Sequence, residues 1–432
     1  MNRGDYLPIT ILIILLGFLF GEVLLSNQIF AQRDVAVFVF PLKHFVVEQL
    51  NAGRIPLWNP YTGCGVPFQA EIQSHMFYPI SLIFYLFPLR FAFNLFIIIH
   101  FFLAGLFMYA MMREFRYNRE PALFSALTFM LSGYLTSLVD LLNNLASLTW
   151  MPLVFFFSKK FVTDEKARSK NALRLSASMG IQFLGGEPLY VLMTLIPSLI
   201  WILYETVFKS LGLKRTQSFL FSGQILSRLK ALPLSTSSRQ ALNLLRGWKH
   251  LKPVLILGSG FLGLIAFQLL PFIEYAPYST RAHGFSYQVA TQWSLPPWQL
   301  LQFILPRFFE FYYGHFWGYI QTWVPDIYLG VVPVFLICCG LRPSLRRKGV
   351  VTFFATSLTI FVLLSLGKYL PIYPFLYQHL GFKVIRYPVR FLAPAVFFYP
   401  FLPERGFEIS SPGIPAGQAS RGSLRLYPGV FS

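Results

Sequence analysis

The run LPITILIILLGFLFGEVLL at residues 7–25 decides the fold class of this chain. A helix that crosses a bilayer needs about 20 consecutive, mostly apolar residues, and this run has that character. It is too long for a signal peptide and lacks a clear small-x-small cleavage site, which favours a retained first helix. Similar runs recur along the chain, so we predict a multi-pass membrane protein.

The composition agrees with this prediction. The 432 residues are 55% hydrophobic and only 12% charged, with a mean hydropathy of +0.56, whereas soluble domains carry about 25% charged residues. Backbone groups in lipid must be satisfied internally, so membrane spans are helices or closed barrels. The apolar runs here are continuous rather than alternating. We therefore expect an all-α, polytopic transmembrane helical bundle of about 9–10 spans.

The basic residues set the orientation of the spans. The formal net charge is +19, and Lys and Arg cluster at residues 113–119, 159–174, 209–252 and 342–348. We take the short, proline-bounded piece 77–87 as interfacial or re-entrant and not as a span. All of these basic clusters then lie on the same side of the membrane. The positive-inside rule then predicts a cytoplasmic N-terminus in the cell (inner or cytoplasmic) membrane. The predicted spans are about 7–25, 91–112, 120–138, 146–161, 172–186, 188–207, 253–271, 327–342 and 350–367, with a partial span from near Phe391.

The positions of these basic residues also indicate which partners to expect. A basic excess in cytoplasmic loops explains the net charge, so we expect no nucleic-acid partner. Loop 208–252 contains amphipathic pieces that favour contact with membrane lipids. The chain has three cysteines, two of them adjacent in an apolar run. Their positions predict neither a structural disulfide nor a metal site.

The domain organisation follows from the spans. Residues 1–402 form the predicted transmembrane domain, with external loops at 26–90 and 272–326. Residues 403–432 change to Ser, Gly, Pro and Arg and contain no apolar run. This tail is either a disordered cytoplasmic end or the mark of a truncated product, and the interrupted last span favours truncation.

The first external loop is the strongest functional signal. Long loops are usually functional or disordered, and this one has too many aromatic residues for a disordered linker. It begins with Asp34 just beyond the first span and contains the run Gly53-Arg54-Ile55-Pro56-Leu57-Trp58-Asn59-Pro60. These residues predict a structured loop that carries a site at the membrane face.

An ordered set of motifs supports a family resemblance. The set comprises Asp34 with Phe40-Pro41, Pro56-x-Trp58-Asn59-Pro60, Gly65-x-Pro67, Phe77-Tyr78-Pro79, His100 with Gly105 and Tyr109, Ser132-Gly133-Tyr134, Trp150-x-Pro152, Gly186-x-Pro188, Gln268-x-x-Pro271, Ser279-x-Arg281 and Arg386-x-Pro388-x-Arg390-Phe391. With these motifs the chain resembles the YfhO-like bacterial membrane proteins, a family of large predicted glycosyltransferases with the GT-C architecture. Family members usually continue through several further spans.

The resemblance implies an enzyme and a reaction. It implies transfer of a sugar from a polyprenyl-phosphate carrier to an extracytoplasmic acceptor of the cell envelope. In GT-C enzymes the first external loop holds an essential acid, and by position that role falls on Asp34. A carboxylate there suits a general base. The alternative from the residues alone is an interfacial acid paired with Arg33 or Lys43.

The leaving phosphate needs cations, because negative charge develops on it as the sugar departs. We assign this role to Arg386, Arg390 and Arg281, since guanidinium groups bind phosphate oxygens in a bidentate way. Binding of anionic headgroups, or snorkelling at the interface, is the alternative for these arginines. A divalent metal is left open, because no Asp-x-Asp or Glu-x-Asp pattern lies beside Asp34.

Four further residues are candidates for substrate binding. Trp58 and Asn59 have a backbone fixed by neighbouring prolines, whereas Trp323 and most other outer tryptophans suit an interfacial belt. Glu187 is a supporting acid or a hydrogen-bonding residue. His100 lies within a predicted span, where an ionisable side chain is either functional or a helix–helix hydrogen bond.

Two other functions remain as alternatives at this stage. A transporter or lipid flippase places charges within the membrane and often carries inverted repeats. In this sequence the ionisable residues lie mostly at span ends and in loops. An inactive truncated fragment is the third alternative, because of the atypical tail.

Overall fold

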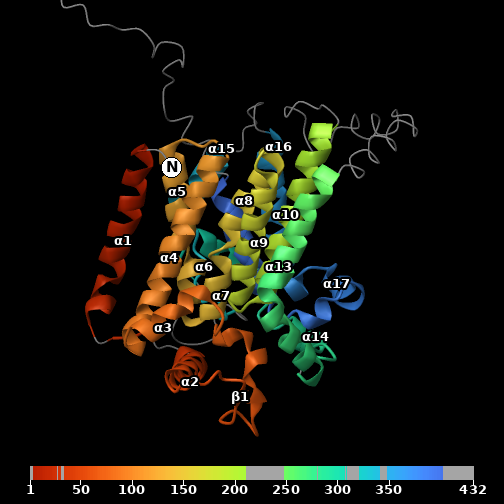
Figure 1. Ribbon diagram of the computed structural model, residues 1–432. Coiled ribbons are helices and arrows are strands. Elements are labelled where there is room, and N and C mark those ends of the chain that lie inside the picture. The colour runs from red at the N-terminus through yellow and green to blue at the C-terminus, as the bar shows by residue number, and fades with distance from the viewer. Residues whose placement is uncertain are drawn as a thin grey trace, which may run out of the picture.

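The computed structural model describes residues 3–26, 28–30, 34–210, 248–279, 281–306, 308, 321–340 and 348–401. In this part of the chain the only sheet is a pair of short antiparallel strands, β1 (Trp58–Asn59) and β2 (Val66–Pro67). Six helices are long and apolar enough to cross a membrane. The molecule is an all-α helical bundle, as predicted (Figure 1).

The helices fall into a bundle and a layer of short elements at one end (Figure 1). The bundle contains α1 (Tyr6–Leu25), α4 (Leu89–Glu114), α5 (Arg119–Met130), α6 (Gly133–Ser137), α7 (Leu142–Leu148), α8 (Met151–Thr163), α9 (Arg168–Leu184), α10 (Pro188–Ser210), α13 (Trp248–Tyr275), α15 (Val331–Gly340), α16 (Lys348–Ser365) and α18 (Leu392–Phe398). The layer contains α2 (Phe40–Asn51), α3 (Ile83–Leu86), α14 (Tyr287–Ala290), α17 (Tyr373–His379) and the two strands.

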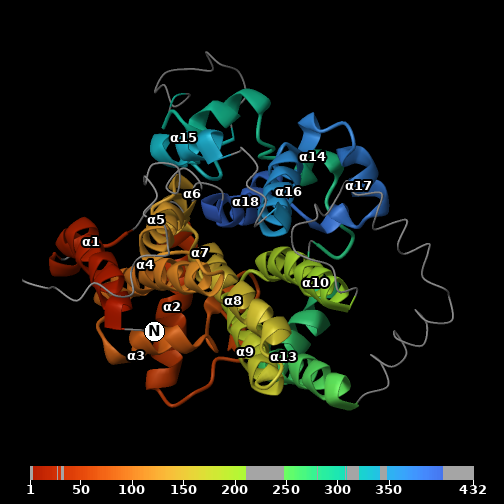
Figure 2. The ribbon, with the colours of Figure 1, turned by 90° about the horizontal axis from the view of Figure 1, so that it is seen from above.

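The burial of the helices suits a bilayer. In the most apolar stretch of each helix, only 17% of the residues are buried in α1 and in α13, against 56% in α4 and 67% in the α7–α8 segment. Side chains such as Phe18 are largely exposed on α1, which packs on α4 at the edge of the bundle (Figure 2). Lipid solvates such faces as well as a protein core does, so their exposure is not costly in a membrane.

Close packing between α9 and α13 depends on small residues. A side chain added at Gly260 would come within 2.7 Å of the Ser176 hydroxyl, whereas Gly258 and Gly263 face open space. The sequence predicts helix packing for all three glycines. The structure places only Gly260 at a helix–helix contact.

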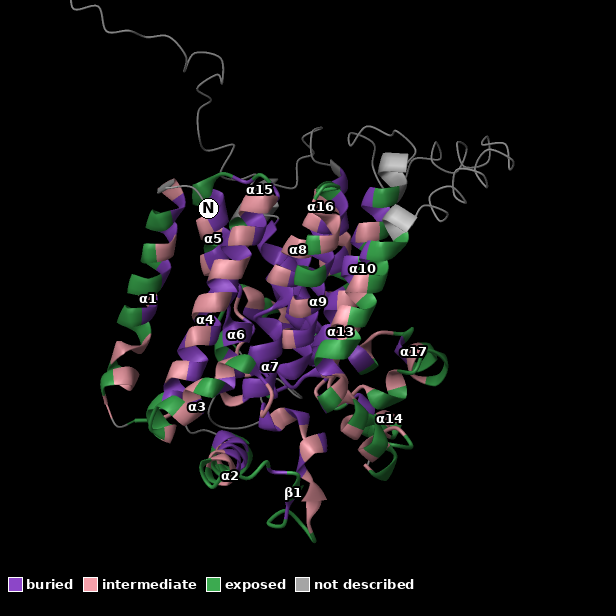
Figure 3. Ribbon diagram, in the orientation of Figure 1, coloured by how far each residue is buried: buried purple, intermediate pink, exposed green. Residues whose placement is uncertain are grey.

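The N-terminus and the basic segments share one end of the bundle. Asp5 pairs with Arg113 and Arg119, at distances of 3.4 and 3.5 Å, and Lys160 pairs with Glu114 at 3.6 Å. The layer with α2, α14 and α17 lies at the other end, as both the ribbon and the burial colouring show (Figures 1 and 3). The two ends therefore differ in chemistry: one is basic, and the other carries the loops.

Several predicted spans need correction. The predicted span at 172–186 corresponds to α9, which connects the basic end near Lys160 with the cavity end at Glu187. α9 has 17 residues and buries polar side chains such as Asn171 and Gln182, so it is not among the described helices that are long and apolar enough to cross a membrane by composition. In the described part of the predicted span at 327–342, residues 327–340, the helix is the ten-residue α15, and α18 has seven residues. The short pieces η5 (Pro79–Leu82) and α3 cannot cross a membrane, as expected for residues 77–87. The central part of loop 208–252 and the tail 403–432 lie outside the described residues.

Candidate functional site

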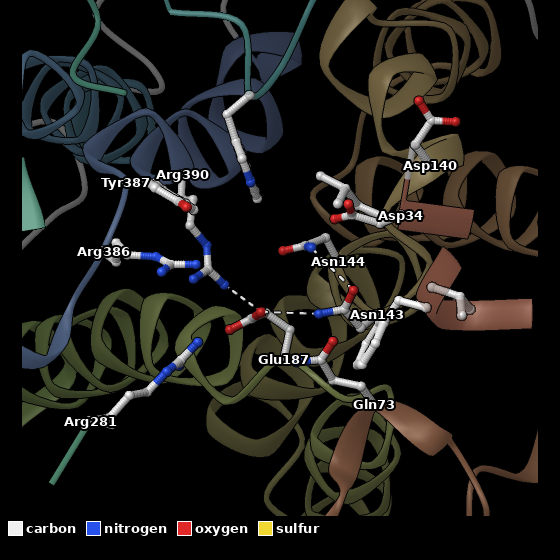
Figure 4. A pocket seen from close by; sticks show the side chains of 14 residues that line it. Asp34, Gln73, Asp140, Asn143, Asn144, Glu187, Arg281, Arg386, Tyr387 and Arg390 are labelled. Carbon is white, nitrogen blue, oxygen red and sulfur yellow. Dashed lines mark hydrogen bonds and ion pairs between the residues drawn. The ribbon is translucent and has the colours of Figure 1, made fainter. Parts of the chain in front are cut away.

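A cavity of about 110 Å³ lies where the loop layer meets the bundle (Figure 4). Segments far apart in the sequence meet here: the first loop, α7, the start of α10, the end of the α13 segment and the turn before α18. The lining residues are Asp34, Phe38, Val39, Gln73, Asp140, Leu141, Asn143, Asn144, Glu187, Arg281, Trp323, Arg386, Tyr387 and Arg390.

Asp34 lies at the cavity with its side chain exposed. It directly precedes a π-helical turn at Val35–Val39 that leads into α2. Within the described residues its carboxylate forms no hydrogen bond or ion pair. Lys43, one of its two expected partners, is instead buried and donates to the Ser74 carbonyl oxygen at 2.6 Å. The second, Arg33, lies outside the described residues. An exposed carboxylate at a cavity is able to accept a proton.

Arg390 and Glu187 form a buried ion pair at the centre of the site. Asn143 donates its amide N–H to Glu187 Oε2 at 3.2 Å, and the Glu187 backbone N–H donates to the Ser147 hydroxyl at 3.0 Å. The Arg390 guanidinium also lies 5.6 Å from the ring centroid of Tyr190. Glu187 therefore neutralises Arg390, and both side chains are held in place by several contacts.

Arg281 and Arg386 differ from Arg390, because neither forms an ion pair within the described part of the chain. Instead the Arg386 guanidinium lies 4.3 Å from the ring centroid of Tyr387 and 5.4 Å from that of Phe285. The Arg281 guanidinium lies 5.8 Å from the same Phe285 ring. Burial lowers the pKa of Arg281, the negative charge of Glu187 opposes this, and the positive charges of Arg390 and Arg386 lower the pKa further. Three cations that share one small region, two of them outside any direct ion pair with a described residue, favour the binding of an anion.

The charges divide the cavity into two walls. Figure 4 shows the three arginines on one side and Asp34, Asp140, Asn143 and Asn144 on the other, with Glu187 between them. Such a site can hold an anionic group against the arginines. A neutral group that loses a proton can then lie beside Asp34.

Asn143, Asn144 and Gln73 were not predicted from the sequence. Two adjacent amides in the otherwise apolar stretch 138–153 are the signal for the first two residues. The Asn144 side-chain oxygen is buried and accepts no hydrogen bond from the described residues. The cavity also includes Trp323, which the sequence assigned to an interfacial belt.

Trp58 and Asn59 are not among the lining residues, so the structure does not bring these two candidates to the cavity. Asn59 is buried and holds a turn, because its side chain accepts from the Tyr61 backbone N–H at 2.9 Å and donates to the Thr62 hydroxyl at 3.1 Å. A side chain at Gly65 would come within 2.6 Å of the Trp58 ring. Both residues shape the tip of the first loop.

His100 is also absent from the cavity lining and belongs to a buried hydrogen-bond network. The Trp150 indole N–H donates to the Tyr78 hydroxyl oxygen at 2.7 Å, and that hydroxyl lies 2.7 Å from His100 Nε2. His100 Nδ1–H donates to the Phe96 carbonyl at 2.6 Å, because a carbonyl oxygen can only accept. In a neutral imidazole Nε2 is then the acceptor, so the Tyr78 hydroxyl gives its proton to Nε2. These contacts give His100 a structural role, the helix-contact alternative left open by the sequence.

No group of three or more His, Cys, Asp or Glu side chains in the described residues could hold a metal ion. No protein-family model, curated protein or solved structure matches the chain. Fold and cavity together define a helical bundle with membrane-length helices and a charged cavity at one end.

Proposed function

We propose that the chain is an integral membrane glycosyltransferase of the GT-C type that uses a polyprenyl-phosphate-linked sugar. The observation that carries the proposal is the joint position of Asp34, Arg281 and Arg386 at one cavity. The resemblance to the YfhO-like proteins, drawn from the ordered motifs, points to the same chemistry. The acceptor is an extracytoplasmic molecule of the cell envelope.

The proposed reaction is a single displacement at the anomeric carbon of the sugar. An acceptor hydroxyl oxygen forms a bond to that carbon while the bond from the carbon to the phosphate oxygen breaks. Asp34 takes the hydroxyl proton. The departing polyprenyl phosphate gains one negative charge, which Arg281 and Arg386 stabilise. Arg390, neutralised by Glu187, keeps that carboxylate and the cavity wall in place.

The orientation of the protein follows from its basic segments. The positive-inside rule assigns the end with Arg113, Arg119 and Lys160 to the cytoplasm. The cavity then faces the outer surface of the cell membrane, where a lipid-linked sugar and an envelope acceptor can meet. The apolar, exposed faces of the bundle suit the prenyl chain of the carrier.

Replacement of Asp34 tests this function. Asp34→Asn keeps the size of the side chain but removes the base, so we expect transfer from a polyprenyl-phosphate sugar to an envelope fraction to fall about 10²–10⁴-fold. Glu48→Gln is the matched control, because Glu48 is an exposed acid of the same loop that does not line the cavity. It should keep wild-type transfer.

Two outcomes would contradict the proposal. One is near-normal sugar transfer by Asp34→Asn protein that inserts at the wild-type level. The other is movement of the lipid carrier across sealed vesicles by the wild-type protein with no covalent product, which would identify a flippase.

A further inference from the structure

Tyr387 has an unusual backbone at the cavity wall. Its φ is +69°, in the left-handed region that disfavours an aromatic L residue. The next residue is Pro388, which also makes the right-handed helical region unfavourable for Tyr387. A costly conformation persists only where its surroundings fix it, and such residues gather at functional sites.

The surrounding contacts fix this conformation from several directions. The Tyr387 backbone N–H donates to the Ala290 carbonyl at 3.3 Å, and the Val389 N–H donates to the Trp293 carbonyl at 3.2 Å. A side chain at Gly367 would come within 2.6 Å of the Pro388 ring, so that glycine allows the loops to pack closely. The turn at residues 386–390 is therefore held against the segment 290–294.

The left-handed backbone has a consequence for the arginines. In an extended chain, neighbouring residues point to opposite faces, so Arg386 and Tyr387 could not both face one cavity. Here Arg386, Tyr387 and Arg390 all line it. The ring of Tyr387 also lies 4.3 Å from the Arg386 guanidinium, a cation–π distance that restrains this long side chain.

We propose that Tyr387 is a positioning residue of the anion site. Its backbone turns Arg386 toward the cavity, and its ring holds the guanidinium ready for the phosphate, so less side-chain freedom is lost on binding. The identity of the anion rests on the proposed function. The positioning itself depends only on the turn, the ring and the two arginines.

Two variants test the role of the ring while the backbone can keep its positive φ. Tyr387→Phe keeps the ring and should bind a short-chain polyprenyl monophosphate within about twofold of the wild type. Tyr387→Gly removes the ring and the steric cost of positive φ. We expect it to bind the same probe about tenfold more weakly, equivalent to about 1.4 kcal/mol, without a fall in unfolding temperature. Binding is measured on the purified full chain in detergent.

Arg116→Gly is the matched control for the backbone. Arg116 has a φ of +66° and lies two residues beyond the end of α4, at the basic end of the bundle. This variant should keep wild-type binding of the probe. It tests whether glycine at a positive-φ position far from the cavity leaves binding of the probe intact.

The results separate this inference from the proposed function. Wild-type affinity in Tyr387→Gly would overturn the positioning role, as would a loss of binding matched by a loss of unfolding temperature. If the wild type binds the monophosphate but transfers no sugar, the enzyme proposal fails and the positioning role stands. If the wild type binds no monophosphate, both proposals are overturned.

Discussion

Two clusters of arginines, each around a buried carboxylate, lie at opposite ends of this bundle. At the basic end, the buried carboxylate of Asp5 pairs with Arg113 and Arg119 and accepts from the Tyr109 hydroxyl at 2.8 Å. Both arginines contact this one carboxylate, so they share its negative charge. The cluster joins the start of the chain to the end of α4 and the start of α5.

The cluster at the cavity is incomplete by comparison. Glu187 pairs with Arg390, but within the described residues neither Arg281 nor Arg386 forms a direct ion pair with a carboxylate. Asp34 faces the same space with no described partner either. The difference shows how the same residue types serve two purposes: fully paired they hold helices together, and partly paired around a cavity they are available to a ligand.

Breaking the central ion pair should have the largest effect. Glu187→Gln leaves Arg390 charged and buried without its partner, which costs about 3–5 kcal/mol of stability. Chemical unfolding in detergent measures this change. Transfer should fall as well, because Asn143 and the arginine wall lose the carboxylate that they share. A loss below about 1 kcal/mol would mean that Glu187 is not the main partner of Arg390.

Removal of an unpaired arginine should affect ligand binding and leave stability nearly unchanged. Arg386→Gln removes a charge-assisted contact to phosphate worth about 2–3 kcal/mol, so the KM for the lipid-linked sugar should rise about 30–160-fold. Stability should change by less than about 0.5 kcal/mol, because no ion pair is lost.

Arg281→Gln should behave in the same way, since Arg281 shares the Phe285 ring with Arg386. A large fall in stability in either variant, with KM unchanged, would contradict the division between paired and unpaired arginines. Steady-state transfer kinetics and unfolding of the same preparations decide between these results.

Much of this arrangement could be predicted from the sequence. The all-α class and the membrane-length helices are confirmed. Asp34, Arg281, Arg386, Arg390 and Glu187 follow or precede apolar runs, so the alternation of spans is enough to put them at one end. Their roles stay predictions.

Other features depend on tertiary contacts that no short pattern contains. The left-handed Tyr387 is fixed by carbonyl groups nearly a hundred residues earlier in the chain. Trp58 looks like a sugar-binding residue from its neighbours, yet its ring packs over Gly65. The segment 172–186 has enough apolar residues to suggest a span, but α9 buries its polar face against neighbouring helices.

Disrupting the Asp5 cluster at the basic end should destabilise the protein less than disrupting the Glu187–Arg390 pair. Asp5→Asn removes the charge that Arg113 and Arg119 share, but both arginines are partly exposed, at 30% and 45%. Water therefore compensates much of the loss, and we expect about 1–2 kcal/mol of destabilisation. Transfer per folded molecule should stay at the wild-type level. Reduced KM or kcat in fully folded Asp5→Asn protein would show that this end also serves catalysis.

The smallest effect on stability is expected for the replacement of His75, a residue of the first loop that contacts the backbone close to Glu187. Its Nε2–H donates to the Gly185 carbonyl at 3.0 Å, two residues before Glu187. Burial lowers the pKa of His75 well below its ordinary value of 6.5, and the charge of Lys43 lowers it further. The folded protein thus keeps His75 neutral where the unfolded chain takes up a proton.

This difference gives His75 a defined pH dependence. Its contribution to stability is complete above pH 6.5 and is lost as the pH falls below that value, by at most about 1.4 kcal/mol per pH unit. His75→Asn keeps a residue type that tolerates the positive φ of 54° at this position but cannot titrate. We expect a flatter stability curve between about pH 5 and pH 7, with exposed His379→Asn as the control. An unchanged acid slope in His75→Asn would mean that the coupling between the first loop and Glu187 does not depend on a neutral imidazole.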